Sequence, residues 1–157
     1  MLIKKCNKRS RVIPAFFIFR LNIHIDDTMD AIAIFIVYVA DQQRSRDFYR
    51  DVILQEPVLD VPGMTEFQLG PGCKLGIMPE NGVARLLGDR IPHPSLGSGI
   101  PRSEVYLYIK NPIDYFKRAI KAGGVSISMP KACDWGDTVA YCADPDGHII
   151  GFAERTA

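Results

Sequence analysis

The stretch EVYLYIK, residues 104–110, places side chains that can do chemistry at alternate positions. Glu104 can act as a general base if it is partly desolvated, because burial raises the pKa of a carboxyl group. Tyr106 and Tyr108 have the same parity, and side chains of one parity point to the same face of a strand. The plainer interpretations are that Glu104 pairs with a lysine and that both tyrosines reflect β-propensity. The spacing predicts a polar, aromatic strand face, with Glu104 as the candidate catalytic residue.

Two further residues with useful chemistry lie in expected loops. Trp135, the only tryptophan, precedes Gly136 in CDWGD and either lines a ligand site or covers its own hairpin. His93 lies in the Pro/Gly-rich stretch RIPHPSLGSG, where a histidine is usually solvated unless the loop folds over a cleft. The short GPG and GSG stretches have no helix after them, so they predict turns rather than phosphate-binding loops.

Composition and charge restrict the class of protein. The 157 residues carry a formal net charge of +1, which gives no reason to expect nucleic acid or an acidic partner. Residues 1–28 hold the basic excess, but their apolar run VIPAFFIF is too short to span a membrane and no signal-cleavage site follows it. The four cysteines are dispersed without a C-x-x-C pair, so we expect no zinc site and a reduced, cytoplasmic protein.

The chain divides into two halves with the same order of elements. In the first half, strands are expected at 31–40, 55–61, 65–70 and 73–79, with a helix at 42–53 after Asp41 as its cap. In the second half, strands are expected at 104–110, 125–129, 137–143 and 148–154, with a helix that follows Asn111, starts at Pro112 and ends at Gly123-Gly124. The two caps lie 70 positions apart. Each half is thus β-α-β-β-β, and one such unit cannot bury both faces of its sheet, so the two should pair.

The expected domain organisation follows from this repeat. Residues 1–28 form an N-terminal extension, which we expect to be disordered or to precede a natural start at Met29. Residues 29–157 form a single domain. It comprises a module at 31–79, a Gly/Pro-rich linker at 80–102 and a module at 103–156.

The stretches VADQQRSRDFYRDVI, DWGD and AYCADPDGHIIGFAE, in this order of elements, resemble the vicinal-oxygen-chelate superfamily over residues 31–156. That group includes glyoxalase I, extradiol dioxygenases, methylmalonyl-CoA epimerase and the bleomycin- and fosfomycin-resistance proteins. The resemblance implies an α+β fold, in which two paired βαβββ modules form a curved mixed sheet around a cleft and helices cover the outer faces. It also implies a homodimer, with the cleft either within one chain or shared between chains.

Metal-using members of the superfamily take their ligands from four strand positions, seven residues before each helix cap and four residues after each hairpin glycine. In this sequence those positions hold Ile34, Gly76, Glu104 and Gly151. A divalent cation needs several oxygen or nitrogen donors, and a single carboxylate does not supply them. We therefore expect no metal and no cofactor.

The concave face is expected to bind a small organic ligand instead. Strand parity and, for Trp135, the resemblance direct these candidate ligand-binding residues to it: Tyr38, Met78, Glu104, Tyr106, Tyr108 and Trp135. The expected function is metal-free sequestration of an organic or antibiotic-like molecule, in the manner of the bleomycin-resistance proteins, with a second copy as the only macromolecular partner. Two alternatives stay open. One is a metal-dependent lyase, isomerase, epimerase or dioxygenase of the glyoxalase type, which requires a one-residue slip of at least two strands. The other is a metal-independent enzyme that uses Glu104 or a tyrosine as acid or base.

Overall fold

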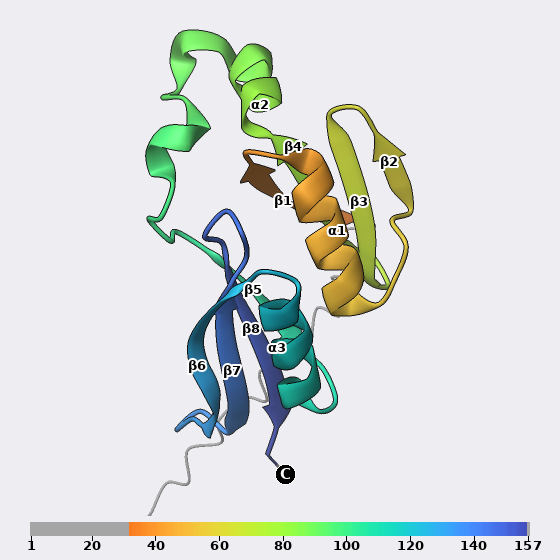
Figure 1. Cartoon of the computed structure of the whole chain (residues 1–157), viewed down its shortest axis with the longest axis vertical. Helices are drawn as coiled ribbons and strands as arrows, with labels where there is room; N and C mark the ends of the chain where they lie inside the picture. The colour runs from red at the N-terminus through yellow and green to blue at the C-terminus, as the bar shows by residue number, and fades with distance from the viewer. Residues whose placement is uncertain (1–31, 157) are drawn as a thin grey trace, which may run out of the picture. The chain divides into compact units, whose positions relative to one another are not determined.

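Each half of the chain folds into a helix packed against a four-stranded sheet (Figure 1). The structure is a computed structural model that describes residues 32–156, so the expected extension at 1–28 lies outside the described residues. The first half comprises β1 (Ala33–Val39), α1 (Gln42–Ile53), β2 (Leu59–Val61), β3 (Met64–Gly70) and β4 (Cys73–Pro79). The second half comprises β5 (Glu104–Tyr108), α3 (Pro112–Lys121), β6 (Val125–Ala132), β7 (Asp137–Ala143) and β8 (Ile149–Arg155).

The two sheets have the same topology. Their strand orders are β1-β4-β3-β2 and β5-β8-β7-β6. In each sheet the first and last strands of the half pair in parallel, and the remaining pairs are antiparallel. A parallel pair needs a crossover, which the remaining elements of each half provide. The predicted α+β class and the repeated βαβββ order are confirmed.

Helix α1 forms over the predicted residues for reasons that are visible in the sequence. The Asp41 carboxylate accepts a hydrogen bond from the backbone N–H of Arg44 at 3.0 Å, which caps the first turn as predicted. Phe48, Tyr49 and Val52 recur at helical spacing and are fully buried against the sheet. Burying each such side chain contributes about 1.5–3 kcal/mol.

Helix α3 begins and ends where the prolines and glycines predict, but Asn111 acts differently from Asp41. Pro112 is the first residue of the helix, and the chain leaves it through Gly123, whose φ is +103°. The Asn111 side chain accepts no hydrogen bond from the helix, because its own backbone is left-handed with φ +59°. Its carbonyl oxygen accepts the N–H of Asp114 instead, at 3.1 Å.

The helix-bearing sides of the two halves share one hydrophobic core. Residues of both halves contribute, among them Phe48, Val52, Leu75, Phe116, Ala140 and Phe152. Helices α1 and α3 contact each other, while no strand of one sheet pairs with a strand of the other among residues 32–156. The helix-free face of each sheet therefore stays open, and we call it the concave face.

The Asp-Pro-Asp-Gly turn between β7 and β8 fastens the second half to α1. Asp144 is buried, and one of its oxygens accepts the Tyr49 hydroxyl at 2.8 Å while the other accepts two backbone N–H groups of its own turn. Asp146 accepts hydrogen bonds from the N–H of Ala40, at 3.0 Å, and from the hydroxyl of Ser45, at 2.8 Å. The sequence indicates only a turn here, whereas the structure shows a fastening between the two halves.

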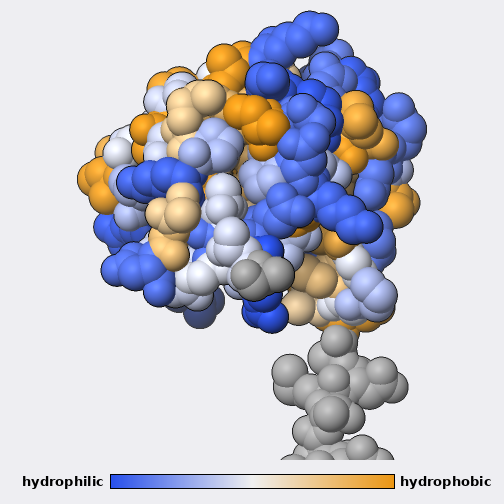
Figure 2. Space-filling model, turned by 90° about the horizontal axis from the view of Figure 1, so that it is seen from below, coloured by the Kyte–Doolittle hydropathy of each residue, from blue (hydrophilic) through white to orange (hydrophobic). Residues whose placement is uncertain are grey.

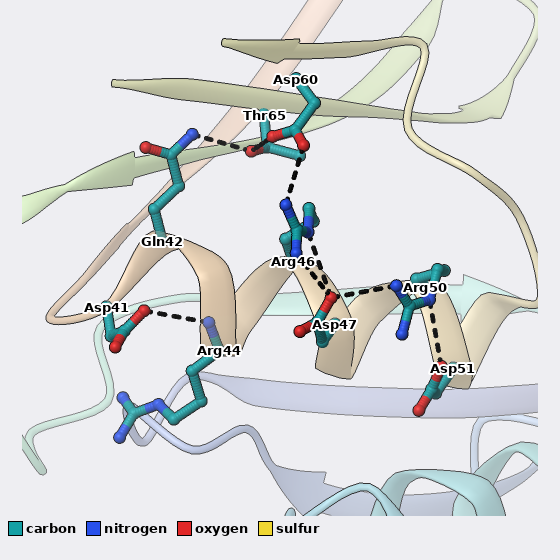
Figure 3. A network of polar contacts seen from close by, with 9 residues as sticks. All are labelled: Asp41, Gln42, Arg44, Arg46, Asp47, Arg50, Asp51, Asp60 and Thr65. Carbon is teal, nitrogen blue, oxygen red and sulfur yellow. Dashed lines mark hydrogen bonds and ion pairs between the residues drawn. The ribbon is translucent and has the colours of Figure 1, made fainter. Parts of the chain in front are cut away.

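A polar network fixes the β2–β3 hairpin on the outer side of α1 (Figure 3). The Arg46 guanidinium lies 3.0 Å from both Asp47 and Asp60. The Thr65 hydroxyl donates to Asp60 at 2.8 Å and receives the Gln42 amide at 2.9 Å. The hydrogen bond from Thr65, helped by Arg46, holds the pKa of Asp60 below its usual value. These contacts lie on the helix side of the sheet, so they stabilise the fold and contribute nothing to the concave face.

The linker at 80–102 contains more regular structure than its prolines and glycines indicate. It forms α2 (Glu80–Leu87) and two short 3₁₀ helices, η1 (Gly88–Arg90) and η2 (Pro94–Gly97). Val83 is buried on the inner side of α2, which shows why this stretch becomes helical despite Gly82. Over residues 32–156, no helix has the length and apolar character needed to cross a lipid bilayer.

Candidate functional site

The concave face of the second sheet gathers its polar and aromatic side chains on three neighbouring strands. Strand β8 lies between β5 and β7, and directly paired residues share a face. Tyr106 pairs with Gly151, which in turn pairs with Tyr141. Arg155 pairs with Asp137 at the end of the same face. The loop before β7 adds Trp135, whose side chain is 61% exposed.

A buried carboxylate holds the tyrosines of β5 in place. One oxygen of Asp137 accepts the hydroxyl of Tyr106 at 2.8 Å and that of Tyr108 at 2.9 Å, and Asp137 is only 2% exposed. The indole N–H of Trp135 donates to the Tyr106 hydroxyl at 3.3 Å. The two tyrosine rings meet edge to face, with centroids 5.4 Å apart. We call these four residues the Asp137 cluster.

Protonation in the cluster is fixed at neutral pH. Burial raises the pKa of Tyr106 to about 12, and the charge of Asp137 acts in the same direction. Burial alone would raise the pKa of Asp137, but hydrogen bonds from Tyr106 and Tyr108 outweigh it and hold that pKa below its usual value. The pKa of Tyr141 is raised by burial and by the nearby carboxylate of Glu104. Asp137 is thus ionised and the Tyr106 phenol is neutral, and neither group is poised to exchange a proton near pH 7.

The two glycines at metal-ligand positions are covered by neighbouring side chains. A Cβ atom at Gly151 would lie 2.9 Å from the Tyr106 ring and 3.0 Å from the Tyr141 ring. A Cβ atom at Gly76 would lie 3.0 Å from the Ile36 side chain and 3.2 Å from that of Ile34. Glycine is required at 151 for the two rings to approach the backbone from either side. The space that a ligating side chain would need is already occupied.

The four positions therefore do not fit a metal ion. They hold one carboxylate, one aliphatic side chain and two glycines, and rings or methyl groups fill the space above the glycines. Within residues 32–156, no three His, Cys, Asp or Glu side chains converge in a way that would bind a cation.

The predicted site residues fall on both sheets. Tyr106, Tyr108 and Trp135 come together in the Asp137 cluster. Tyr38 and Met78 are paired neighbours on the concave side of the first sheet, where the Tyr38 backbone oxygen accepts the ring N–H of His148 at 2.7 Å.

Glu104, the remaining predicted residue, is the first residue of β5 and is exposed. Its side chain makes no hydrogen bond or ion pair with any residue in the 32–156 range. Its exposure removes the desolvation that a general base at this position would need.

Three residues of the site escaped the sequence reasoning: Asp137, Tyr141 and Arg155. Within β8 Arg155 has the same parity as Gly151, and within β7 Asp137 has the same parity as Tyr141. What was missing was the register between β7 and β8, which brings Arg155 opposite Asp137. A sequence scan that paired the two strands across the Asp-Pro-Asp-Gly turn would have placed all three on the tyrosine-bearing face.

A separate cavity of about 580 Å³ lies between β1, the linker and the turn before β8. Its walls include Phe35, Leu96 and Ile100. His93 also lines it, but both ring nitrogens are engaged locally, Nδ1 with Ser95 at 2.8 Å and Nε2 with Asn81 at 3.2 Å. His93 therefore caps η2 and offers no free nitrogen to a ligand.

Comparison with known proteins identifies the family. Residues 32–156 match the family described as the glyoxalase-like domain, and the chain belongs to this family within the vicinal-oxygen-chelate superfamily. A comparison with curated proteins finds no match.

Solved structures with the same fold support this assignment. A glyoxalase-related enzyme from Fulvimarina pelagi is 22% identical with a TM-score of 0.68, over 81% of this chain and 89% of that one. A glyoxalase/bleomycin resistance protein/dioxygenase family enzyme from Burkholderia phytofirmans is 14% identical with a TM-score of 0.62, over 80% and 98%. A glyoxalase/bleomycin resistance protein/dioxygenase from Nocardioides is 18% identical with a TM-score of 0.58, over 80% and 83%. At these identities the likeness is one of fold.

Proposed function

We propose that this protein binds a small organic molecule without a metal and sequesters it on the concave face of the second sheet. The observation that carries the proposal is the Asp137 cluster, in which a buried carboxylate orients two tyrosines beneath an exposed tryptophan. Aromatic rings supply contact area at low entropic cost, and fixed polar groups supply orientation. The names of two similar structures include bleomycin resistance protein beside glyoxalase and dioxygenase.

The chemistry of the cluster favours binding over turnover. An acid–base catalyst works best when its pKa lies near the working pH. The pKa of Tyr106 is about 12 and that of Asp137 is below its usual value, so at neutral pH one stays protonated and the other ionised. Hydrogen bonds within the cluster preorganise the rings before a ligand arrives, which lowers the entropic cost of binding.

We also propose that a second copy of the chain completes the binding cleft. Ile34, Ile36 and Tyr38 on the first sheet are 36–40% exposed, although they are large and apolar. Strands β1 and β5 each lie at the edge of their sheet, with one side unpaired among the described strands. Figure 2 shows scattered hydrophobic residues exposed between hydrophilic ones on one other face of the molecule. A dimer that covers the first sheet would bury the exposed apolar residues of β1 and the unpaired strand edges. It would also leave the Asp137 cluster facing an enclosed space.

Light scattering after size exclusion tests the dimer. We expect a mass of two chains for the wild type and of one chain for Ile36→Asp, because a buried charge at the interface would be unpaired. A wild-type mass of one chain at high protein concentration would contradict the dimer and leave the binding proposal standing.

We place this activity in a reducing compartment, the cytoplasm. Cys73, Cys133 and Cys142 are free thiols, and disulfides are the usual state of paired cysteines in oxidising compartments. Mass spectrometry of the protein alkylated during cell lysis would check this, with full alkylation after denaturation as the expected result.

The single tryptophan provides the direct test of binding. Trp135 gives the only indole N–H resonance of the protein, so a nitrogen-15 labelled sample reports on the site alone. We expect at least one member of a panel of aromatic small molecules to shift this resonance saturably. Tyr108→Ala, which removes a ring that is 58% exposed, should weaken that binding about tenfold.

Leu96→Ala is the matched control, because Leu96 is 75% exposed and lines the separate cavity under the linker. It should leave the affinity unchanged. If Leu96→Ala weakens binding and Tyr108→Ala does not, the ligand occupies the linker cavity and the proposed site is wrong.

A further inference from the structure

Arg155 presents a guanidinium at one end of the proposed binding face. Its central carbon lies 5.1 Å from the centroid of the Tyr108 ring, in a cation–π arrangement. Within residues 32–156, no carboxylate lies at ion-pair distance from it, although Asp137 is its cross-strand partner. A guanidinium carries five N–H donors in a planar fork that matches the two oxygens of a carboxylate. Arg155 is exposed.

The nearest negative charge on this face is buried. Asp137 is only 2% exposed, and it already accepts the hydroxyls of Tyr106 and Tyr108. A ligand that approaches the face meets the rings and the guanidinium before it meets this carboxylate. The buried charge fixes the rings, and the exposed charge that contacts the Tyr108 ring is the positive charge of Arg155.

The exposed charges on the concave side of β5 and β6 agree with this polarity, and Glu154 of β8, which has the opposite parity to Arg155, faces the other side of the sheet. Glu104 lies four residues before Tyr108 on β5, which places it about 13 Å away along the strand. Lys131 pairs with Val139 on β7, shares the concave face and is exposed. The Tyr108 end of the face is therefore positive, and the one exposed carboxylate of β5 lies at the other end.

Two exposed rings of the Asp137 cluster offer flat, apolar surface. Trp135 is 61% exposed and Tyr108 is 58% exposed. The indole N–H points to the Tyr106 hydroxyl at 3.3 Å, so the tryptophan is held by its edge and keeps its ring faces for contact. Large aromatic side chains that stay exposed but are held by hydrogen bonds are suited to stack on a planar ligand.

We propose that the ligand of this site is a planar aromatic carboxylate, whose carboxylate pairs with Arg155 and whose ring lies against Trp135 and Tyr108. This inference rests on the function proposed above and names the ligand class of that same site. In this inference Arg155 is the residue that selects ligands with a negative charge. No bond is made or broken in the process.

Three probes that share one ring system test the ligand class. They are 2-naphthoate, 2-naphthylmethylamine and 2-naphthalenemethanol, titrated against the nitrogen-15 labelled full-length protein while the Trp135 indole resonance is followed. We expect 2-naphthoate to bind about tenfold more tightly than the alcohol, as one charge-assisted bidentate contact contributes on that scale. The amine should bind more weakly than the alcohol, because like charges repel.

Variants at Arg155 separate charge recognition from stacking. Arg155→Gln should remove the preference for 2-naphthoate and leave the alcohol unchanged, and Arg155→Lys should restore the preference in part, because it keeps the charge and loses the fork. Lys121→Gln, at the exposed end of α3, is the matched control for net charge and should change nothing.

The outcomes distinguish this inference from the function on which it rests. If the alcohol or the amine binds as tightly as 2-naphthoate, or if Arg155→Gln leaves the preference intact, the ligand class is wrong while the binding function stands. If none of the three shifts the indole resonance, the ligand class is also wrong, and the wider panel described above decides the binding function.

Discussion

Replacing Gly151 by alanine tests whether tyrosine rings cover the position that a metal ligand would need. The new Cβ atom would lie 2.9 Å from the Tyr106 ring and 3.0 Å from the Tyr141 ring, closer than van der Waals contact allows. Tyr106 cannot rotate away freely, because its hydroxyl is bonded to Asp137 at 2.8 Å. Overpacking of this kind destabilises a fold by about 1–3 kcal/mol. For a domain of this size we expect the Tm to fall by about 4–12 °C.

Two other glycines serve as controls for this substitution. Gly76→Ala places its Cβ 3.0 Å from the Ile36 side chain and 3.2 Å from that of Ile34, and no hydrogen bond holds either side chain, so we expect a smaller cost than for Gly151→Ala. Gly82→Ala in α2 meets nothing within 4 Å and should stabilise the protein by about 0.5–1 kcal/mol, because alanine favours a helix.

Differential scanning calorimetry of the three variants provides the comparison, and the indole resonance of Trp135 provides a local readout. In Gly151→Ala that resonance should shift, because the indole donates to the Tyr106 hydroxyl. If Gly151→Ala melts with the wild type and its indole resonance stays in place, the rings do not cover the glycine and the reasoning about the filled metal position is refuted.

Three further predictions concern buried polar groups. Tyr49→Phe removes the hydroxyl that donates to one carboxylate oxygen of buried Asp144, so the free energy of unfolding in urea should fall by about 1–3 kcal/mol. Tyr115→Phe is the control and should change the free energy of unfolding little, because the Tyr115 hydroxyl makes no hydrogen bond within the described residues. Burial raises the pKa of Cys142 to about 12, so this thiol should resist alkylation until the protein is denatured; rapid alkylation of the native protein would show that the strand is not packed as described. The pKa of Asp137 is depressed in the folded state, so its contribution to stability is complete above its ordinary pKa of 3.8 and is lost as the pH falls through the lower folded value. The stability difference between the wild type and Asp137→Asn should therefore be larger at about pH 6 than below pH 3.8, and a difference that grows on acidification would reverse the sign of the argument.

Local patterns predicted most of the elements, since they depend on neighbours along the chain. The helix at 42–53 and the strands at 73–79 and 137–143 have the predicted bounds. The helix α2 was missed because the linker contains Gly82 and leads into a run of prolines, and its stability comes from Val83 packing inside. Tertiary burial outweighed local propensity there.

The site was predictable only as far as strand parity reaches. Parity placed Tyr106 and Tyr108 on one face, but it does not say which residue of β7 lies opposite which residue of β8. That register places Asp137 next to the tyrosines and places Arg155 opposite Asp137, at the end of the concave face. The fastening role of Asp146 was out of reach for the same reason, because its partners lie about a hundred residues earlier in the chain.

The most direct test of the central claim is the affinity for 2-naphthoate, or for whichever compound of the panel binds, measured by titration calorimetry with and without a chelator and again after addition of Zn²⁺, Mn²⁺ or Ni²⁺. The arrangement of Tyr106, Tyr141 and Gly151 predicts the same dissociation constant under all these conditions. Binding that disappears with the chelator and returns with a metal would contradict a metal-independent site.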